Sequence, residues 1–315
     1  MVLGRRPVRE RVGDWILHGL TGAAAFGSLV LVGLLVYELV KQAWPAIDRY
    51  GLGFVTSRAW DPVKTNFGAL DFIYGTAITS LVAIVIAAPL ALAIALFLSE
   101  LAPRGVRGVI GALVEMLAAI PSVVIGLWGI FVLAPVLKDP IQPFLHHWLG
   151  WIPLFSGEPS ATGLGYFTAA VVLTIMVLPI TASIARELFL NVPGDLKEAA
   201  LALGMTRWEM IRGVVLPYTK GGLIAAIILG LSRAIGEAIA VTQVIGGTLG
   251  IHVSLFANGD TLASRIASQY QGAATNIQVA ALVYLALILL VISLVTNFGA
   301  QLIVRRFEFQ RTGGD

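Results

Sequence analysis

Six long apolar runs dominate this sequence, and each is long enough to cross a lipid bilayer as a helix. Of the 315 residues, 57% are hydrophobic and only 12% are charged, about half the charged share of an ordinary soluble domain. Strands that span membranes are shorter and alternate in polarity, so the runs predict an all-α polytopic membrane protein. The predicted spans are residues 16–37, 72–98, 109–137, 164–185, 223–245 and 277–304.

Composition excludes several classes of function. The chain has no cysteine, which removes disulfides and thiolate metal sites, and none of its four histidines has a partner at metal-binding spacing. The net charge of +3 is too small to indicate a nucleic-acid partner. The sequence contains no G-x-x-x-x-G-K-[ST] phosphate loop and no G-x-S-x-G elbow. We therefore predict no catalytic residue, no metal site and no cofactor in this chain.

The distribution of basic residues predicts the topology. The first run is too long for a secretory signal and no cleavage site follows it, so we expect a retained span. With the amino terminus in the cytoplasm, 14 of the 21 Lys and Arg residues lie on the inner side, six on the outer side and one inside a span. Both termini are then cytoplasmic. The outer loops are residues 41–71, 138–163 and 246–276.

A polar segment, EAALALGMTRWEMIRGVVLP, separates the fourth and fifth spans at residues 198–217. Asp195 with Glu198, and Thr206 with Glu209, have the spacing of capping boxes at helix starts. Gly204 between them suits a left-handed helix end. The pattern predicts two short cytoplasmic helices joined by a glycine turn, and the alternative is an amphipathic hairpin on anionic headgroups.

The same segment resembles the EAA loop of bacterial ABC importer permeases, in which it forms a helix that docks on a separate ATPase. One position differs, because this chain has Val214 where the family usually has isoleucine. The resemblance assigns ATPase coupling to Glu198, Ala199, Ala200, Gly204, Leu216 and Pro217.

Three further stretches, FGALDFIYGTAITSL, LAAIPSVVIGLWG and SRAIGEAIAV, are similar to phosphate-importer permeases of the PstC type. The resemblance implies a type I (MetI-like) permease core over residues 67–306, with residues 1–66 before it and a cytoplasmic tail at 307–315. It also implies a PstA-like second permease, a PstB-like ATPase dimer that binds ATP and Mg²⁺, and a periplasmic phosphate-binding protein. We expect the chain to lie in the bacterial inner membrane.

Arg233 and Glu237 are charged residues inside the fifth predicted span. An arginine near the bilayer midplane costs about 2.5 to 3.5 kcal/mol on insertion scales unless it faces a partner or a wet cavity. In one continuous helix, Glu237 lies one turn from Arg233 on the same face. We interpret Arg233 as a fixed cation for an anion path, since its planar fork suits phosphate. The alternative is a buried ion pair that only neutralises itself.

Three hydroxyl residues are weaker candidates for the substrate path. Ser122 follows Pro121, which interrupts the third span and frees backbone amides. Thr79 and Ser80 lie near the outer end of the second span, where they line a path or bond back to helix carbonyls. Two other functions stay open: a permease for sulfate or molybdate, and an ion-coupled secondary transporter.

Overall fold

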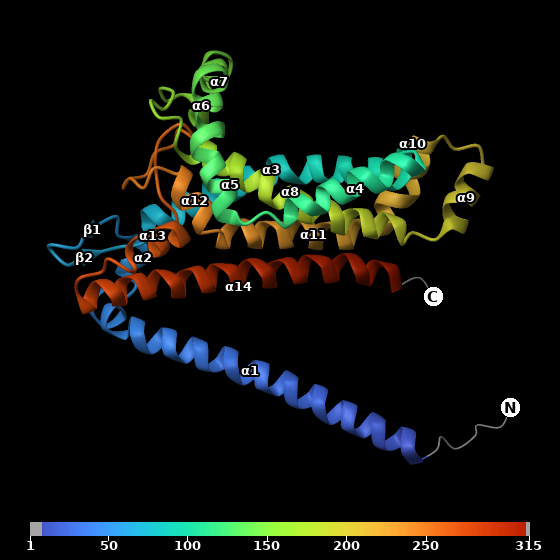
Figure 1. The fold of residues 1–315 in the computed structure, drawn as a ribbon, viewed down its shortest axis with the longest axis horizontal. Helices are drawn as coiled ribbons and strands as arrows, with labels where there is room; N and C mark the ends of the chain where they lie inside the picture. Colours follow the sequence, from blue (N-terminus) through green and yellow to red (C-terminus); the bar gives the residue numbers. More distant parts are fainter. Residues whose placement is uncertain (1–7, 313–315) are drawn as a thin grey trace.

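The computed structural model describes residues 8–312, which form a bundle of long helices (Figure 1). Six helical stretches are long and apolar enough to cross a membrane, which confirms the predicted number of spans. α3 and α8 pack along each other at the centre, and α11 and α14 lie beside them. The long helices are α1 (Val8–Tyr50), α3 (Leu70–Leu96), α4 (Arg104–Ala118), α8 (Tyr166–Leu190), α11 (Leu216–Gly236) and α14 (Asn276–Thr312).

Shorter elements connect the long helices. A two-stranded antiparallel ribbon in the first outer loop pairs Trp60 with Phe67. The elements are α2 (Gly53–Thr56), β1 (Trp60–Asp61), β2 (Asn66–Phe67), α5 (Ser122–Trp128), α6 (Ala134–Val136), α7 (Gln142–Leu149), η4 (Pro153–Phe155), α9 (Gly194–Ala202), α10 (Arg207–Met210), α12 (Ile239–Val244) and α13 (Leu262–Gln269). Four wider helical turns are η1 (Phe97–Leu101), η2 (Gly129–Leu133), η3 (Leu137–Ile141) and η5 (Ile211–Val215).

Two predicted spans are not the single helices that we expected. The run 109–137 is divided, because α4 ends at Ala118 and a second helical stretch runs from Ser122 to Leu149. Pro121 lacks an N–H and disfavours helical geometry at the residue before it, which explains the break. The run 223–245 is also divided, between α11 and α12, while its helix begins earlier, at Arg207.

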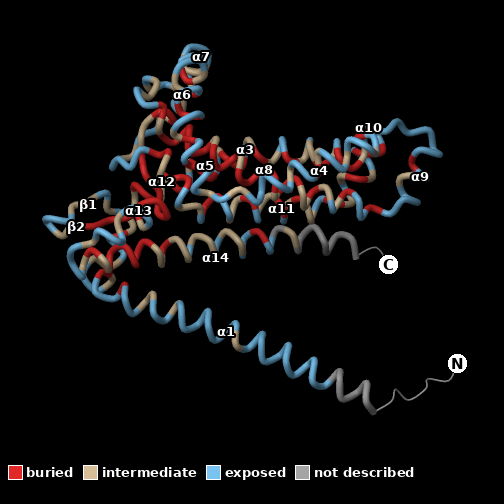
Figure 2. Tube along the Cα trace, in the orientation of Figure 1, coloured by how far each residue is buried: buried red, intermediate tan, exposed pale blue. Residues whose placement is uncertain are grey.

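The core is built from small and branched side chains on α3, α8, α11 and α12. Close approach of α11 to α8 requires Gly230, where an added side chain would collide with Val177 and Thr181. Small residues let membrane helices approach each other closely, which matters because the hydrophobic effect does not drive helices together within lipid. α8 is the most buried of the candidate spans, and α1 has no buried residue in its most apolar window, as Figure 2 shows. The apolar surface of α1 is therefore covered from outside this chain.

Candidate functional site: an arginine at the end of a long helix and a capped glycine turn

Arg233 lies in an open hollow of about 510 Å³ near the end of α11. The hollow is lined by Ile180, Leu229, Ser232, Arg233, Gly236 and Glu237, and the Arg233 side chain is exposed within this chain. α11 runs from Leu216 to Gly236, so Arg233 is about 25 Å from its start at roughly 1.5 Å per residue. The position places a permanent cation deep in an apolar helix and in contact with open space.

Glu237 does not lie on the same helical face as Arg233, which corrects the expectation of an i,i+4 pair. The helix ends at Gly236, and Glu237 has extended backbone angles (φ −72°, ψ 119°). Its Oε1 accepts a hydrogen bond from the Ala240 backbone N–H at 3.3 Å, at the start of α12. Among the residues whose side chains are described, no ion pair within 4.0 Å joins Glu237 to Arg233. In this conformation the Arg233 charge is not neutralised by that carboxylate.

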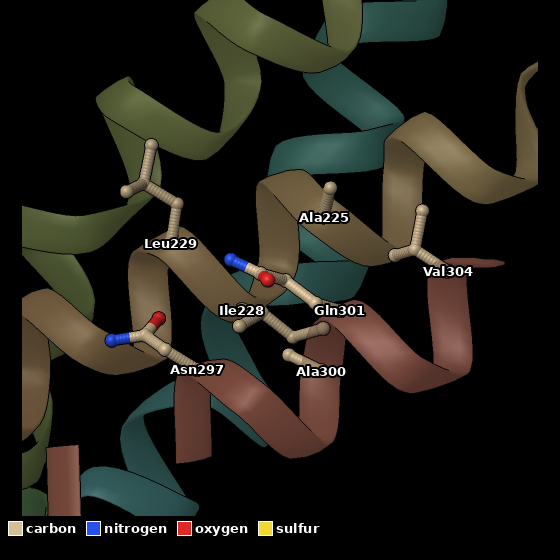
Figure 3. Close-up of a pocket in the computed structure, with 7 residues that line it drawn as sticks. All are labelled: Ala225, Ile228, Leu229, Asn297, Ala300, Gln301 and Val304. Atoms are coloured by element: carbon tan, nitrogen blue, oxygen red, sulfur yellow. The ribbon is translucent and has the colours of Figure 1, made fainter. Parts of the chain in front are cut away.

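A second hollow, of about 370 Å³, lies between α11 and α14 (Figure 3). Two amides on α14, Asn297 and Gln301, face Ala225, Ile228 and Leu229 on α11 across it. Leu229 lines both hollows, so the two are neighbours along α11. Ser232 Oγ donates a hydrogen bond to Asn297 Oδ1 at 2.8 Å. This bond links α14 to the residue that precedes Arg233.

The three hydroxyl candidates do not gather around Arg233. Thr79 and Ser80 are buried on α3, where Thr79 Oγ1 donates to the Gly75 carbonyl at 2.7 Å and Ser80 Oγ to the Thr76 carbonyl at 2.6 Å. These contacts match the alternative in which the hydroxyls bond back to their own helix. Ser122 is half-buried at the first residue of α5. None of the three lines the Arg233 hollow.

The polar loop at residues 195–217 keeps the predicted glycine turn and one of the two capping boxes. Gly204 has φ +86°, in the left-handed region, and the box between Thr206 and Glu209 forms in both directions. The box between Asp195 and Glu198 is absent: α9 begins at Gly194, two residues too early for an Asp195 cap, so Asp195 lies inside the first turn. There a carboxylate still complements the helix dipole, although it caps no amide.

The second short helix is not separate from the fifth span. α10, η5 and α11 form one helical stretch from Arg207 to Gly236, with Pro217 tolerated in the first turn of α11. The glycine turn is therefore followed directly by the helical stretch that carries Arg233.

The loop residues divide into buried and exposed sets. Ala200 and Met210 are buried against Phe189 and Val192 at the end of α8, which fixes α9 to the bundle. Glu198, Ala199, Gly204 and Pro217 are exposed, and Leu216 is half-buried. Leu203 and Trp208 are large apolar side chains that are 83% and 62% exposed. An apolar patch of this kind beside a capped turn is typical of a protein-binding surface.

The sequence interpretation missed two ion pairs, of which one joins distant parts of the chain. Lys197 Nζ lies 2.6 Å from Glu100 Oε1 in that distant pair, and Arg265 Nε lies 2.7 Å from Asp260 Oδ2 within the third predicted outer loop. The Arg265 guanidinium also lies over the Phe72 ring. Burial raises the pKa of the Asp260 carboxyl, against the opposing effect of Arg265. No local pattern connects the partners of the first pair, which are 97 residues apart.

Comparison with known proteins gives the family. Residues 87–309 match the family described as binding-protein-dependent transport system inner membrane component. The chain is 45% identical to the phosphate transport system permease protein PstC of Mesorhizobium japonicum, over 97% of this chain and 94% of that protein. It is 43% identical to the PstC protein of Pasteurella multocida, over 96% and 94% of the two chains.

Solved structures show the same fold at low identity. A chain of the bacterial alginate ABC transporter, solved with an alginate pentasaccharide-bound periplasmic protein, is 19% identical, with a TM-score of 0.56 over 95% of this chain and 99% of that one. A chain of the inward-facing MetNI methionine ABC transporter is 21% identical, with a TM-score of 0.50 over 74% and 91%. This multi-pass membrane protein therefore belongs to the PstC family of phosphate transport system permease proteins.

Proposed function

We propose that this chain forms half of the path of an ATP-driven importer of inorganic phosphate. The observation that carries the proposal is the exposed Arg233, which faces an open hollow where α11 is interrupted. A guanidinium without a carboxylate at that depth requires water or an anion beside it. Phosphate suits it because two of its oxygens match the guanidinium fork. The phosphate named in the relatives' descriptions agrees with this chemistry.

The energy comes from a separate subunit, since the sequence contains no phosphate loop of its own. The exposed Leu203 and Trp208 beside Gly204 are the docking surface for that subunit. A PstB-like ATPase dimer binds ATP and Mg²⁺, a PstA-like permease completes the path, and a periplasmic phosphate-binding protein delivers the ion. α9, α10 and the described ends of α1 and α14 lie at one end of the bundle (Figure 1). The proposal assigns that end to the cytoplasm.

Glu237 contributes to selectivity in this proposal. Its carboxylate lines the same hollow as Arg233, and one of its oxygens is engaged by Ala240. A free carboxylate oxygen accepts a hydrogen bond from a protonated phosphate oxygen, whereas sulfate carries no proton at neutral pH. Glu237→Gln is expected to increase inhibition of phosphate uptake by sulfate. If sulfate inhibits uptake equally in the wild type and in Glu237→Gln, selectivity is set by the binding protein.

The test of the function is phosphate uptake by the complete importer in proteoliposomes. Arg233→Met is expected to abolish ATP-dependent uptake, while Arg58→Met, which changes an exposed arginine just before β1, retains it. Uptake without ATP, or full uptake by Arg233→Met, contradicts the proposal.

A further inference from the structure

Lys197 connects three helices on the cytoplasmic side through one ammonium group. It lies on α9, its Nζ is 2.6 Å from Glu100 Oε1 in η1 at the end of α3, and it donates to the Phe189 carbonyl on α8 at 3.0 Å. The two charged side chains are only 18% and 11% exposed. Removing one partner of a pair this well covered leaves a charge without compensation, so the pair resists separation.

The remaining contacts of α9 with the bundle are apolar. Ala200 packs into the cluster that contains Phe189 and Val192, while Glu198 and Ala199 face outward. Apolar contact is not directional and allows surfaces to slide over each other. A short charge-assisted bond fixes both distance and direction. The ion pair between Lys197 and Glu100 therefore fixes the position of α9 relative to the end of α3.

The outer end of α3 is attached to the third outer loop by hydrogen bonds. The Asp71 carboxylate accepts from the Gly250 N–H at 2.7 Å, and Thr76 Oγ1 accepts from the Leu262 N–H at 3.0 Å. A side chain at Gly75 would collide with the carbonyl of Asp260, so the loop lies directly against the helix. This loop follows α12, which begins just after Glu237.

We infer that α3 carries movement of α9 to the third outer loop, and that Lys197 and Glu100 are the positioning residues that attach α9 to α3. The inference rests on the proposed function, in which a separate ATPase moves α9. α3 is a single helix from Leu70 to Leu96, with Pro89 inside it, and it packs extensively against α8, so displacement at η1 is expected to reach the segment around Asp71. Lys197 is mostly covered by its own chain and does not belong to the surface offered to the ATPase.

The experiment measures ATP hydrolysed and phosphate imported in the same proteoliposomes with the complete importer. The variants are Lys197→Met, Glu100→Gln and the exchanged pair Lys197→Glu with Glu100→Lys. Glu115→Gln is the matched control, because it removes an inter-helix pair with Arg186, 3.6 Å apart, that joins α4 to α8 without touching α9. Binding of the ATPase is measured by co-purification.

Each single variant is expected to keep the ATPase bound and to raise the ATP consumed per phosphate by about fivefold or more, the lower end of coupling between distant sites. The exchanged pair is expected to restore the ratio, and Glu115→Gln to leave it unchanged. An unchanged ratio in the single variants, loss of the ATPase from them, or an exchanged pair that restores nothing overturns the inference. A wild-type complex that imports no phosphate with ATP overturns the proposed function instead.

Discussion

The two ends of α3 are built on different principles. At the outer end, Asp71, Thr76, Asp260 and Arg265 are buried and each has a polar partner within this chain, although Asp71 Oδ1 accepts no hydrogen bond. At the other end of the bundle, a capped turn leaves Leu203 and Trp208 exposed. Buried polar groups without partners are costly, whereas exposed apolar groups are available to another surface. The outer end is thus held mainly by contacts within one chain, whereas under the proposed function the inner end is completed by the ATPase subunit.

The largest effect is expected from breaking the outer end. Asp260→Asn leaves the Arg265 guanidinium buried without its counter-charge, which costs about 3 to 5 kcal/mol. Thermal unfolding in detergent, followed by tryptophan fluorescence, measures the loss, since Trp60 lies beside Arg265. Asp61→Asn is the control because its contact with Lys64 at 4.0 Å is exposed. Equal melting temperatures for the two variants would show that the outer pair contributes little.

At the inner end, we expect a substitution to weaken binding of the ATPase subunit with little effect on stability. Trp208→Ala removes a side chain that is 62% exposed, so the free energy of unfolding changes by about 0.5 kcal/mol or less. Affinity for the ATPase subunit is expected to fall roughly 30-fold, as for a central interface tryptophan. Trp148→Ala, at 64% exposure on the outer side, is the matched control and keeps its affinity. Equal affinities for both variants would place the docking surface elsewhere.

The smallest effect is expected at the glycine turn. An added Cβ at Gly204 meets no atom within 4 Å, so Gly204→Ala tests only the backbone conformation at φ +86°. We expect a loss of about 1 to 2 kcal/mol of local stability, measured by hydrogen exchange across α9. Gly213→Ala, which also has open space but no positive φ, is expected to be neutral or stabilising. Equal exchange in the two variants would show that the turn tolerates a right-handed end.

The sequence predicted those features that depend on neighbouring residues. The six apolar stretches, the turn at Gly204 and the box between Thr206 and Glu209 are all specified within a few positions, and each is confirmed. The Asp195 box was wrong because α9 starts two residues early, with Pro193 at the N-cap position. A shift of two residues is enough to remove a cap.

Features that depend on tertiary contacts were not predictable. The end of α11 at Gly236 places Glu237 off the helix, and nothing in the apolar run around it signals the break. Trp60, in the first predicted outer loop, is buried, and its indole N–H donates to Gln269 Oε1 at 2.8 Å. Its partner is 209 residues away, beyond the reach of any local pattern.

The central claim is that the hollow beside Arg233 is a wet path for phosphate. Because the chain has no cysteine, a single thiol at Gly236 reports on that hollow, and a Cβ there meets no atom within 4 Å. In the complete importer, Gly236→Cys is expected to react with a membrane-impermeant thiosulfonate and to be protected by phosphate. Leu31→Cys on α1 is expected not to react. A Gly236→Cys thiol that reacts only with a lipid-soluble maleimide would place the hollow in the lipid and contradict the account.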